Sequence, residues 1–530
     1  MSRSDPDRAL PVLSTGPSGG AAKPAAGVAA SGSACHGGKE RMKAQAAAAG
    51  KAEVLEQLAE DYPLGPHDQP QGMCPAFGSL RVGLRMRRTA TVLSGSACCV
   101  YGLTFTSHFY GARRTVGYVP FNSETLVTGQ LFEDIKQALT DLADPERYDA
   151  IVMTNLCIPT ASGVPLDLLP DQINGVRIIG IDVPGFGVPT HAEAKDVLAS
   201  ALLKHARTEA ANGPVARPRK LVDSVPTVTL IGELFPADPI GIDALLQPMG
   251  MAVGTSVPPR EWRELYAALD CRVAAATHPF YTASVRQFEA AGRPVVGSAP
   301  VGAEGTAAWL KAVGEAADLK ASVIGKAVDI ARKATLEAIA RTPIKGRVHV
   351  SGYEGSELLV ARVLAEAGAE ITHVGTALPR TVWSRPDQEW LEARGVTVKY
   401  RASLEDNLKA FEEHEPDLAI GTTPLVQAAK EAGTPALYFT NLISARPIFG
   451  AMGAGGLSQV IKGAMDGRER LSKMRTFFEG VGTGHARGYG WTEVPERRLT
   501  AKERHAQARR DKRKSKKAAA AGSEAVEANA

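Results

Sequence analysis

The run DAIVMTN at residues 149–155, followed at once by Leu156 and Cys157, decides how the chain folds. An apolar run of this length that ends in a turn is typical of a buried strand in a parallel sheet. Similar runs recur along the chain, and most of them precede an amphipathic helical stretch. Strands and helices that alternate at this spacing along the chain predict an α/β protein with parallel, doubly wound sheets.

Twelve strands are predicted, in three consecutive regions. Helices are expected near 129–142 and 190–206 of the first region, and after each strand of the second. The predicted strands are 115–121, 149–155 and 176–183 in the first region, 227–232, 251–255, 272–277 and 293–298 in the second, and 347–352, 369–376, 396–402, 418–423 and 435–440 in the third.

Each region is expected to form one Rossmann-like subdomain, which is three in all for a chain of 530 residues. The predicted first subdomain carries the three cysteines discussed below. The predicted boundaries are 1–50 for an N-terminal arm, 51–220, 221–345 and 346–495 for the three subdomains, and 496–530 for a basic tail.

Both ends of the chain are predicted to be disordered. Residues 1–50 are rich in Ala, Gly, Ser and Pro, so burial could not offset the entropy lost on ordering them. Cys35 and His36 lie in this arm and are not expected to bind metal. Residues 502–517 carry nine Lys or Arg within a chain of net charge +4. A solvated tail is favoured over binding to nucleic acid or to an anionic membrane surface.

Composition and missing motifs exclude several classes of protein. Six cysteines in so long a chain are too few for a disulfide scaffold and favour a reducing compartment. The sequence has neither an apolar run of bilayer length nor a secretory signal, so a soluble cytoplasmic protein is expected. It also has no GxxxxGK[ST] motif, so any ATP chemistry is expected to belong to a partner. No GxGxxG follows a predicted strand, which disfavours dinucleotide binding.

Three cysteines stand in predicted loops of the first third of the chain: Cys74, Cys99 and Cys157. Their spacings of 25 and 58 residues are too wide for a zinc ribbon or a local ferredoxin motif. Loops at the carboxyl ends of parallel strands converge, so the fold could assemble one site from all three. Three thiolates leave a four-iron cluster one ligand short, and another chain could supply it. Cys98 competes with Cys99, and spacing alone does not choose between them.

Other candidate groups carry a weaker signal. His278 and Tyr281 stand in the loop THPFYTAS after a predicted strand and could donate protons to a substrate. A locally hydrogen-bonded histidine is the favoured interpretation. Glu354, in GYEGSE, is interpreted as a carboxylate at the start of a helix, where the helix dipole favours negative charge.

Three adjoining segments resemble a known family: QGMCPAFGSLRVGLR (71–85), the run from Arg88 to Ile135 that contains SGSACCVYG, and MTNLCIPTASGVPLDLLP (153–170). They are similar to the family of nitrogenase component 1, dark-operative protochlorophyllide reductase and chlorophyllide a reductase, and within it to the Y subunits of the last. The likeness runs over roughly 70–490. It implies the three-subdomain architecture that the strand pattern predicts independently.

The resemblance implies that Cys74, Cys99 and Cys157 are ligands of a bridging 4Fe-4S cluster, with the remaining ligand on a homologous Z subunit. In the family the middle ligand follows a glycine by four positions, as Cys99 follows Gly95. The implied assembly has two Y and two Z chains. A separate ATP-hydrolysing X protein would deliver single electrons.

The implied reaction is reduction of the C7=C8 double bond in ring B of chlorophyllide a. Peripheral contact with the photosynthetic membrane is left open. Two alternatives also remain open. One is a related subunit with another substrate, either protochlorophyllide reductase-like or nitrogenase-like, and the nitrogenase version is disfavoured because no late Cys and His cofactor pair is visible. The other is a scaffold for cluster assembly.

Overall fold

The computed structural model describes residues 74–109, 116–218, 225–232, 239–444, 446–471 and 509. Every element given below belongs to one compact unit, which ends at Ser472. The predicted N-terminal arm and nearly all of the basic tail lie outside the described residues, as do Cys35 and His36. No helix in the described ranges is long and apolar enough to cross a bilayer.

The first sheet has the strand order β2-β1-β3-β5-β4, and all of its pairs are parallel except β4 with β5. Its strand β1, which pairs with β2 and β3, is absent from our strand predictions, because Thr and Ser interrupt its short apolar run. The elements are α3 (Ala76–Arg85), β1 (Thr89–Ser94), α4 (Ala97–Phe109), β2 (Val116–Val119), α5 (Ser123–Val127), α6 (Gln130–Leu142), β3 (Ala150–Asn155), α7 (Cys157–Ala161), the 3-10 helix η1 (Leu166–Leu168), β4 (Gln172–Ile173), β5 (Val176–Asp182) and α8 (His191–Asn212).

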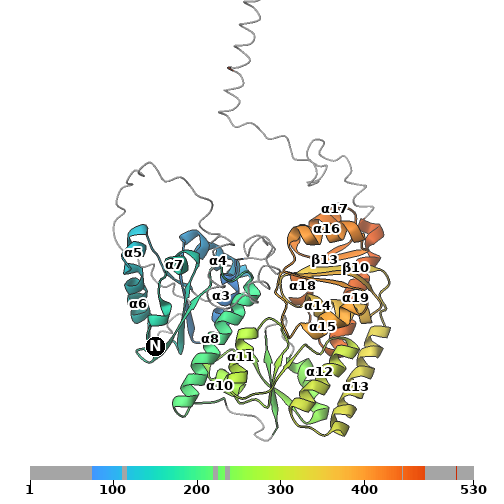
Figure 1. Ribbon diagram of the computed structural model, residues 1–530, viewed down its shortest axis with the longest axis horizontal. Coiled ribbons are helices and arrows are strands. Elements are labelled where there is room, and N and C mark those ends of the chain that lie inside the picture. Colours follow the sequence, from blue (N-terminus) through green and yellow to red (C-terminus); the bar gives the residue numbers. More distant parts are fainter. Residues whose placement is uncertain are drawn as a thin grey trace, which may run out of the picture. The chain divides into compact units, whose positions relative to one another are not determined.

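The second sheet has the order β7-β6-β8-β9 and is wholly parallel. Helices α10 and α11 cover one of its faces, and α12 with α13 cover the other (Figure 1). The elements are β6 (Thr227–Ile231), α9 (Pro239–Leu246), the 3-10 helix η2 (Gln247–Met249), β7 (Ala252–Val257), α10 (Trp262–Leu269), β8 (Val273–Ala276), α11 (Thr282–Ala290), β9 (Val295–Gly297), α12 (Gly302–Ala316) and α13 (Ala321–Ala340).

The third sheet has the order β12-β11-β10-β13-β14 and is also parallel. The prediction of an α/β fold with several parallel sheets is therefore confirmed. The elements are β10 (Arg347–Gly352), α14 (Glu357–Glu366), β11 (Glu370–Thr376), α15 (Arg385–Glu392), β12 (Thr397–Tyr400), α16 (Leu404–His414), β13 (Leu418–Gly421), α17 (Thr423–Glu431), β14 (Ala436–Tyr438), α18 (Phe439–Ser444) and α19 (Gly450–Asp466).

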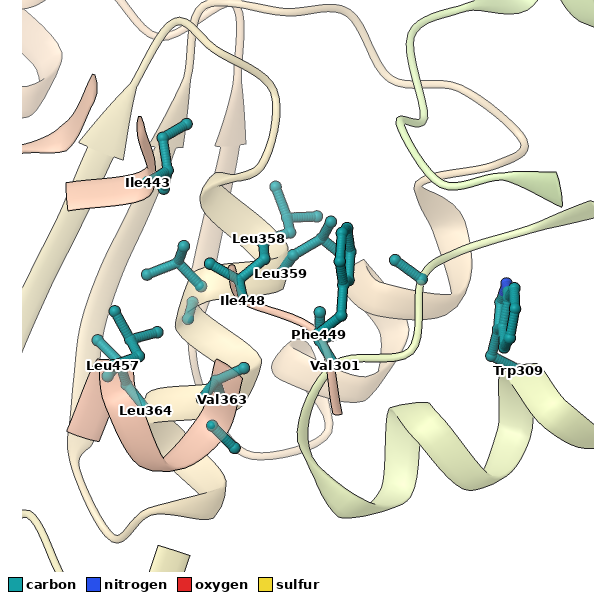
Figure 2. Packing of buried hydrophobic residues seen from close by; sticks show 14 of the residues in the cluster. Val301, Trp309, Leu358, Leu359, Val363, Leu364, Ile443, Ile448, Phe449 and Leu457 are labelled. Atoms are coloured by element: carbon teal, nitrogen blue, oxygen red, sulfur yellow. The ribbon is translucent and has the colours of Figure 1, made fainter. Parts of the chain in front are cut away.

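Two large apolar cores join the three sheets. Alternate residues of β6 divide between them, so that Leu230 packs toward α12 and the third sheet, whereas Ile231 packs toward α8 and the first sheet. Figure 2 shows part of the first of these cores, where Val301 lies beside Phe449 and near Leu359. Because both faces of the strands are covered, the sheets are doubly wound as the sequence pattern predicts.

Helix α8 is the element that ties the first sheet to the second. Its Asp196 carboxylate accepts hydrogen bonds from the backbone N–H groups of Ala283 and Ser284, at 2.7 and 2.8 Å, where α11 begins. An anionic side chain is favoured at such a helix N-terminus. Near the other end of α8, Glu209 accepts from Tyr266 Oη at 2.6 Å and from Trp262 Nε1 at 3.1 Å.

The Glu209 contacts predict a pH-dependent contribution to stability. Burial disfavours the charge of Glu209, but hydrogen bonds from His205, Tyr266 and Arg177 lower its pKa to about 2, from an ordinary value of 4.5. A depressed carboxyl pKa stabilises the fold above the ordinary pKa, and the contribution is lost as the pH falls toward the folded-state value.

We expect Glu209→Gln to lower the free energy of unfolding by about 1.5–3 kcal/mol at pH 7, since hydrogen bonds to a charged group are lost. The loss should shrink as the pH falls below about 4.5. Urea unfolding at several pH values checks both points, with the exposed Glu389→Gln as the control. A loss that is the same at pH 3 and pH 7 would contradict this interpretation.

Candidate functional site

The cysteine site lies where the strand order of the first sheet reverses. The chain runs from β1 outward to β2 and then returns to β3, so β1 and β3 flank this switch point. Ligands of open α/β sheets bind outside the carboxyl ends of such strands. Cys99 lies in the first turn of α4, just after β1, and Cys157 is the first residue of α7, just after β3.

The two loops approach each other because Gly95 has no side chain. A Cβ atom placed on Gly95 would lie 2.4 Å from Cδ1 of Leu156. The backbone N–H of Leu156 donates to the carbonyl of Ser94 at 2.8 Å and fixes this approach. Tyr118 Oη donates to the Gly95 carbonyl at 3.3 Å. The loop that carries Cys99 is therefore fixed against the residue that precedes Cys157.

Cys157 is also held from the side of β5. Its Sγ accepts a hydrogen bond from the backbone N–H of Gly185 at 3.1 Å. A Cβ on Gly185 would lie 3.6 Å from this sulfur, so the backbone approaches it without obstruction. A thiolate is the form of cysteine that binds metals.

Cys74 precedes the first sheet in the chain. It stands directly before α3, and its carbonyl accepts from the N–H of Phe77 at 3.0 Å. Helix α3 packs against α8 so closely that a Cβ on Gly78 would lie 1.8 Å from the carbonyl oxygen of His191. The position of Cys74 therefore depends on how these two helices pack.

The thiols of Cys74, Cys99 and Cys157 influence one another electrostatically. Burial raises the pKa of Cys74, and the charge of Cys157 raises it further. Burial also raises the pKa of Cys99, with further contributions from Cys98, Cys74 and Cys157. Each of these cysteines is exposed. Their role as ligands of one site stays a prediction.

Cys98 has different surroundings from Cys99. Its Sγ lies 3.1 Å from Ser96 Oγ. The hydrogen bond with Ser96 is the main cause that lowers the pKa of Cys98, and a contact with Cys99 also contributes. Cys99, in contrast, responds to both distant thiols. The preference for Cys99 over Cys98 rests on the family resemblance and stays a prediction.

The donor set suits iron and sulfur chemistry. In the described ranges, no three His, Cys, Asp or Glu side chains are grouped closely enough to bind a single metal ion. A four-iron cube takes one ligand per iron, so it distributes its thiolates over several metal atoms. Soft thiolate ligands favour such clusters.

Exposed apolar side chains stand close in sequence to Cys99 and Cys157. On α4, Tyr101 and Phe105 are 72% and 54% exposed, and their rings stack with centroids 6.1 Å apart. Ile158, next to Cys157, is 42% exposed. We call these three residues the apolar rim. A cluster of large exposed apolar groups is typical of a surface that another protein covers.

The structure corrects our interpretation of Glu354. Glu357, not Glu354, accepts hydrogen bonds from the backbone at the start of α14: its Oε1 accepts from the N–H of Glu354 and its Oε2 from the N–H of Gly355, each at 2.9 Å. The Glu354 carboxylate instead contacts His191 and Thr440, which belong to other parts of the chain. The sequence of this loop alone could not indicate that His191 and Thr440, which are distant in the chain, are the partners of Glu354.

The other secondary candidates are buried. His278 is hydrogen-bonded, as the sequence predicts. The predicted partner was a local one, however, whereas the observed partner is the carbonyl of Glu354 at 2.7 Å, which is distant in the sequence. Tyr281 is wholly buried, and burial raises its pKa above the ordinary range. Neither is exposed to a substrate. Sequence reasoning missed His191 and Lys195, although their spacing of four residues on a predicted helix places them on one face.

Comparisons with known proteins agree with this architecture. A model of the family described as nitrogenase component 1 type oxidoreductase matches residues 74–466. The chain is 66% identical to the chlorophyllide reductase 52.5 kDa chain of Rhodobacter capsulatus, over 87% of this chain and 93% of the relative. It is 26% identical to a light-independent protochlorophyllide reductase subunit N from Synechococcus sp., over 57% of this chain and 68% of that protein.

A solved structure of similar fold is nitrogenase Cp1 at pH 6.5, with a TM-score of 0.60 and 18% sequence identity. The match covers 77% of this chain and 93% of that one. At this level of identity the likeness concerns the fold alone. It agrees with the arrangement of parallel sheets described above.

The contact at Gly95 generates a testable prediction. In Gly95→Ala the new methyl group must displace Leu156, so we expect the free energy of unfolding to fall by about 1–3 kcal/mol, as for other overpacked sites. The rate at which Cys157 is alkylated should also change, because Leu156 directly precedes Cys157 in the chain. The matched control is Gly102→Ala in α4, where a Cβ meets nothing within 4 Å.

Urea unfolding and peptide mass spectrometry after iodoacetamide treatment measure the two effects. We expect Gly102→Ala to be neutral or to stabilise by up to about 1 kcal/mol, since alanine is the better helix former. Equal unfolding midpoints for the two variants would show that the approach of the loops does not depend on Gly95.

Proposed function

Because the chain belongs to the nitrogenase component 1 type oxidoreductases, we propose that it is a catalytic subunit of a chlorophyllide a reductase, of the Y type. The observation that carries the proposal is the 66% identity to a chlorophyllide reductase chain over 93% of that relative's length. The positions of Cys99 and Cys157 at the switch point of the first sheet support it, as does the electrostatic influence of Cys74 and Cys157 on Cys99.

The three cysteines would hold a 4Fe-4S cluster at the edge of the subunit. The cluster, when bound, supplies low-potential single electrons to the reaction. This chain contributes the three thiolates, the N–H of Gly185 beside the sulfur of Cys157, and the approach of the loops at Gly95. The remaining ligand would come from a homologous Z subunit, since a cube takes one ligand per iron.

The apolar rim supports a partner at this edge. Exposed Tyr101, Phe105 and Ile158 stand beside exposed cysteines, which is what a subunit interface across a shared cluster requires. The proposed assembly has two Y and two Z chains. ATP would be hydrolysed by a separate X protein, in accord with the absence of a P-loop motif from this sequence.

The proposed reaction is the reduction of the C7=C8 double bond of chlorophyllide a. Two electrons arrive one at a time, and two protons are added to the two ring carbons. A flat, apolar macrocycle needs a site with apolar walls near the electron donor, from which water is excluded. The apolar rim would supply this chain's part of that wall. A protochlorophyllide substrate is less well supported, since the corresponding relative is only 26% identical.

The first test compares Cys99→Ser with Cys98→Ser. The chain is purified without oxygen together with its Z partner, and iron content and low-temperature EPR are measured. We expect Cys99→Ser to lose most of the iron and the EPR signal, because a thiolate ligand is removed. Cys98→Ser, the matched control, should keep both. Loss of iron in both variants, or in neither, would contradict the ligand assignment.

The same preparations test the reaction. With the X protein, ATP and a reductant, wild type and Cys98→Ser should convert chlorophyllide a to a bacteriochlorin, which absorbs at longer wavelength, and Cys99→Ser should not. Turnover of protochlorophyllide alone would favour the alternative substrate. A chain that binds iron but neither pigment would favour the scaffold for cluster assembly.

The rim yields a separate prediction about assembly. We expect Tyr101→Ser and Phe105→Ser each to weaken association with the Z chain by about 1–2 kcal/mol or more, as buried interface aromatics do. Ile330→Ser on α13 is the control, because Ile330 is 50% exposed but lies far along the chain in the second region. Pull-down and analytical ultracentrifugation measure association. Equal effects at all three positions would show that the rim is not the interface.

A further inference from the structure

The switch points of the second and third sheets face each other and are closed. The strand order reverses between β6 and β8 in the second sheet and between β10 and β13 in the third. His278 follows β8, Glu354 follows β10, and His278 Nε2 lies 2.7 Å from the Glu354 carbonyl. Gly355 permits this contact, since its φ is +93° and a Cβ there would lie 2.6 Å from the His278 ring. The two places where such sheets usually bind ligands are therefore in direct contact through buried residues.

The Glu354 carboxylate lies at the centre of this closed region. It lies 3.2 Å from His191 Nε2, accepts from Thr440 Oγ1 at 3.0 Å, and is 4.0 Å from Lys195 Nζ. The side chains of His191 and Lys195 are 1% exposed, and that of Glu354 is 5% exposed. A buried charge needs partners of this kind.

The charges in the group compensate one another. Burial opposes ionisation of Glu354, but His191 and Lys195 outweigh it and hold the pKa of this carboxyl below its usual range. Burial lowers the pKa of His191, Glu354 opposes this change, and the ring Nε2 lies within hydrogen-bond distance of the carboxylate. Burial also lowers the pKa of Lys195 to about 7, with Glu354 opposing the change. Glu354 is thus the anion around which the others are arranged.

His191 and Lys195 both belong to the first turns of α8. At a spacing of four residues they lie on one face of the helix. Between them, Glu193 accepts two hydrogen bonds from the Arg401 guanidinium, at 2.7 and 2.9 Å. Arg401 follows β12, so the start of α8 is bound to the third region at two points.

The start of α8 in turn supports the helix that follows Cys74. The carbonyl of His191 stands against Gly78 of α3, where no Cβ would fit, and the ring of His191 lies 6.5 Å from that of Phe77. Phe77 donates its N–H to the carbonyl of Cys74. A continuous line of contacts therefore runs from Glu354 through His191 and α3 to Cys74.

We propose that Glu354 is a positioning residue for the cysteine site: by holding His191 and Lys195 it fixes the start of α8, and through the contact of α8 with α3 it fixes Cys74. The third region thus determines the position of a cysteine in the first. The inference rests on the proposed function only for the role assigned to Cys74, because the contacts themselves exist without a cluster.

The test uses Glu354→Gln in the full-length chain, purified with its partner. The amide keeps the shape of the side chain but removes the charge that Lys195 faces. Hydrogen exchange of the peptides that cover 76–85, and iodoacetamide labelling of Cys74 after removal of iron, are followed by mass spectrometry. We expect both to become faster by roughly threefold to tenfold, as local opening becomes easier. Labelling of Cys157, held by Gly185, should stay unchanged.

The matched control is Asp387→Asn. Asp387 is as buried as Glu354 and pairs with Arg362, but its partners lie in the second and third regions and not on α8. This variant should leave exchange in α3 and labelling of Cys74 unchanged. If Glu354→Gln does not fold, the double variant Lys195→Met/Glu354→Gln replaces it, because it leaves no unpaired charge inside the protein.

Unchanged hydrogen exchange in α3 of the folded Glu354 variant would overturn the inference. An equal acceleration of this exchange in Asp387→Asn would also overturn it, because it would indicate a general loss of stability. Hydrogen exchange and labelling report on local opening and not on turnover, so they are independent of the proposed reaction. In the iron-loaded complex, a changed EPR line shape in Glu354→Gln but not in Asp387→Asn would add a spectroscopic sign of a displaced ligand. An identical line shape in both would count against it.

Discussion

The structure depends on helix α8, because this one helix is bound to all three sheet regions. Along its length, Asp196 accepts from the start of α11 in the second region, while Lys195 faces Glu354 of the third. At its first residue, His191, it supports α3, which belongs to the first region. Most of these contacts are polar and buried, so each requires its partner to be in place. The relative placement of the sheets is therefore specified by a few paired groups and not by apolar packing alone.

That arrangement gives the three switch points different uses. In the second and third sheets the carboxyl ends of the strands are closed against each other through His278 and Glu354. In the first sheet they remain open, with exposed Cys99 and Cys157 and the apolar rim beside them. A site on an exposed edge suits chemistry shared with another chain, in which the second protein completes the ligand set and excludes water. The contacts between the second and third sheets support that edge of the first sheet through α8.

Much of the fold could be predicted from sequence, because parallel strands that are buried on both faces read as short apolar runs such as DAIVMTN. Strand β1 was not predicted, because Thr91 and Ser94 are buried polar residues within it. Cys74, Cys99 and Cys157 could be proposed from their loops, but the choice of Cys99 over Cys98 needed the family resemblance. The group around Glu354 could not be found, because His191 is 163 residues away in the chain and only the folded topology brings them together.

The most direct test of the central claim is the anomalous scattering of iron in crystals of the chain with its Z partner, grown without oxygen. The account predicts a peak for a four-iron cluster within bonding distance of the sulfurs of Cys74, Cys99 and Cys157, with Cys98 not bonded and the remaining ligand on the partner. Iron bound to Cys98 in place of Cys99, or iron located away from the switch point of the first sheet, would contradict it.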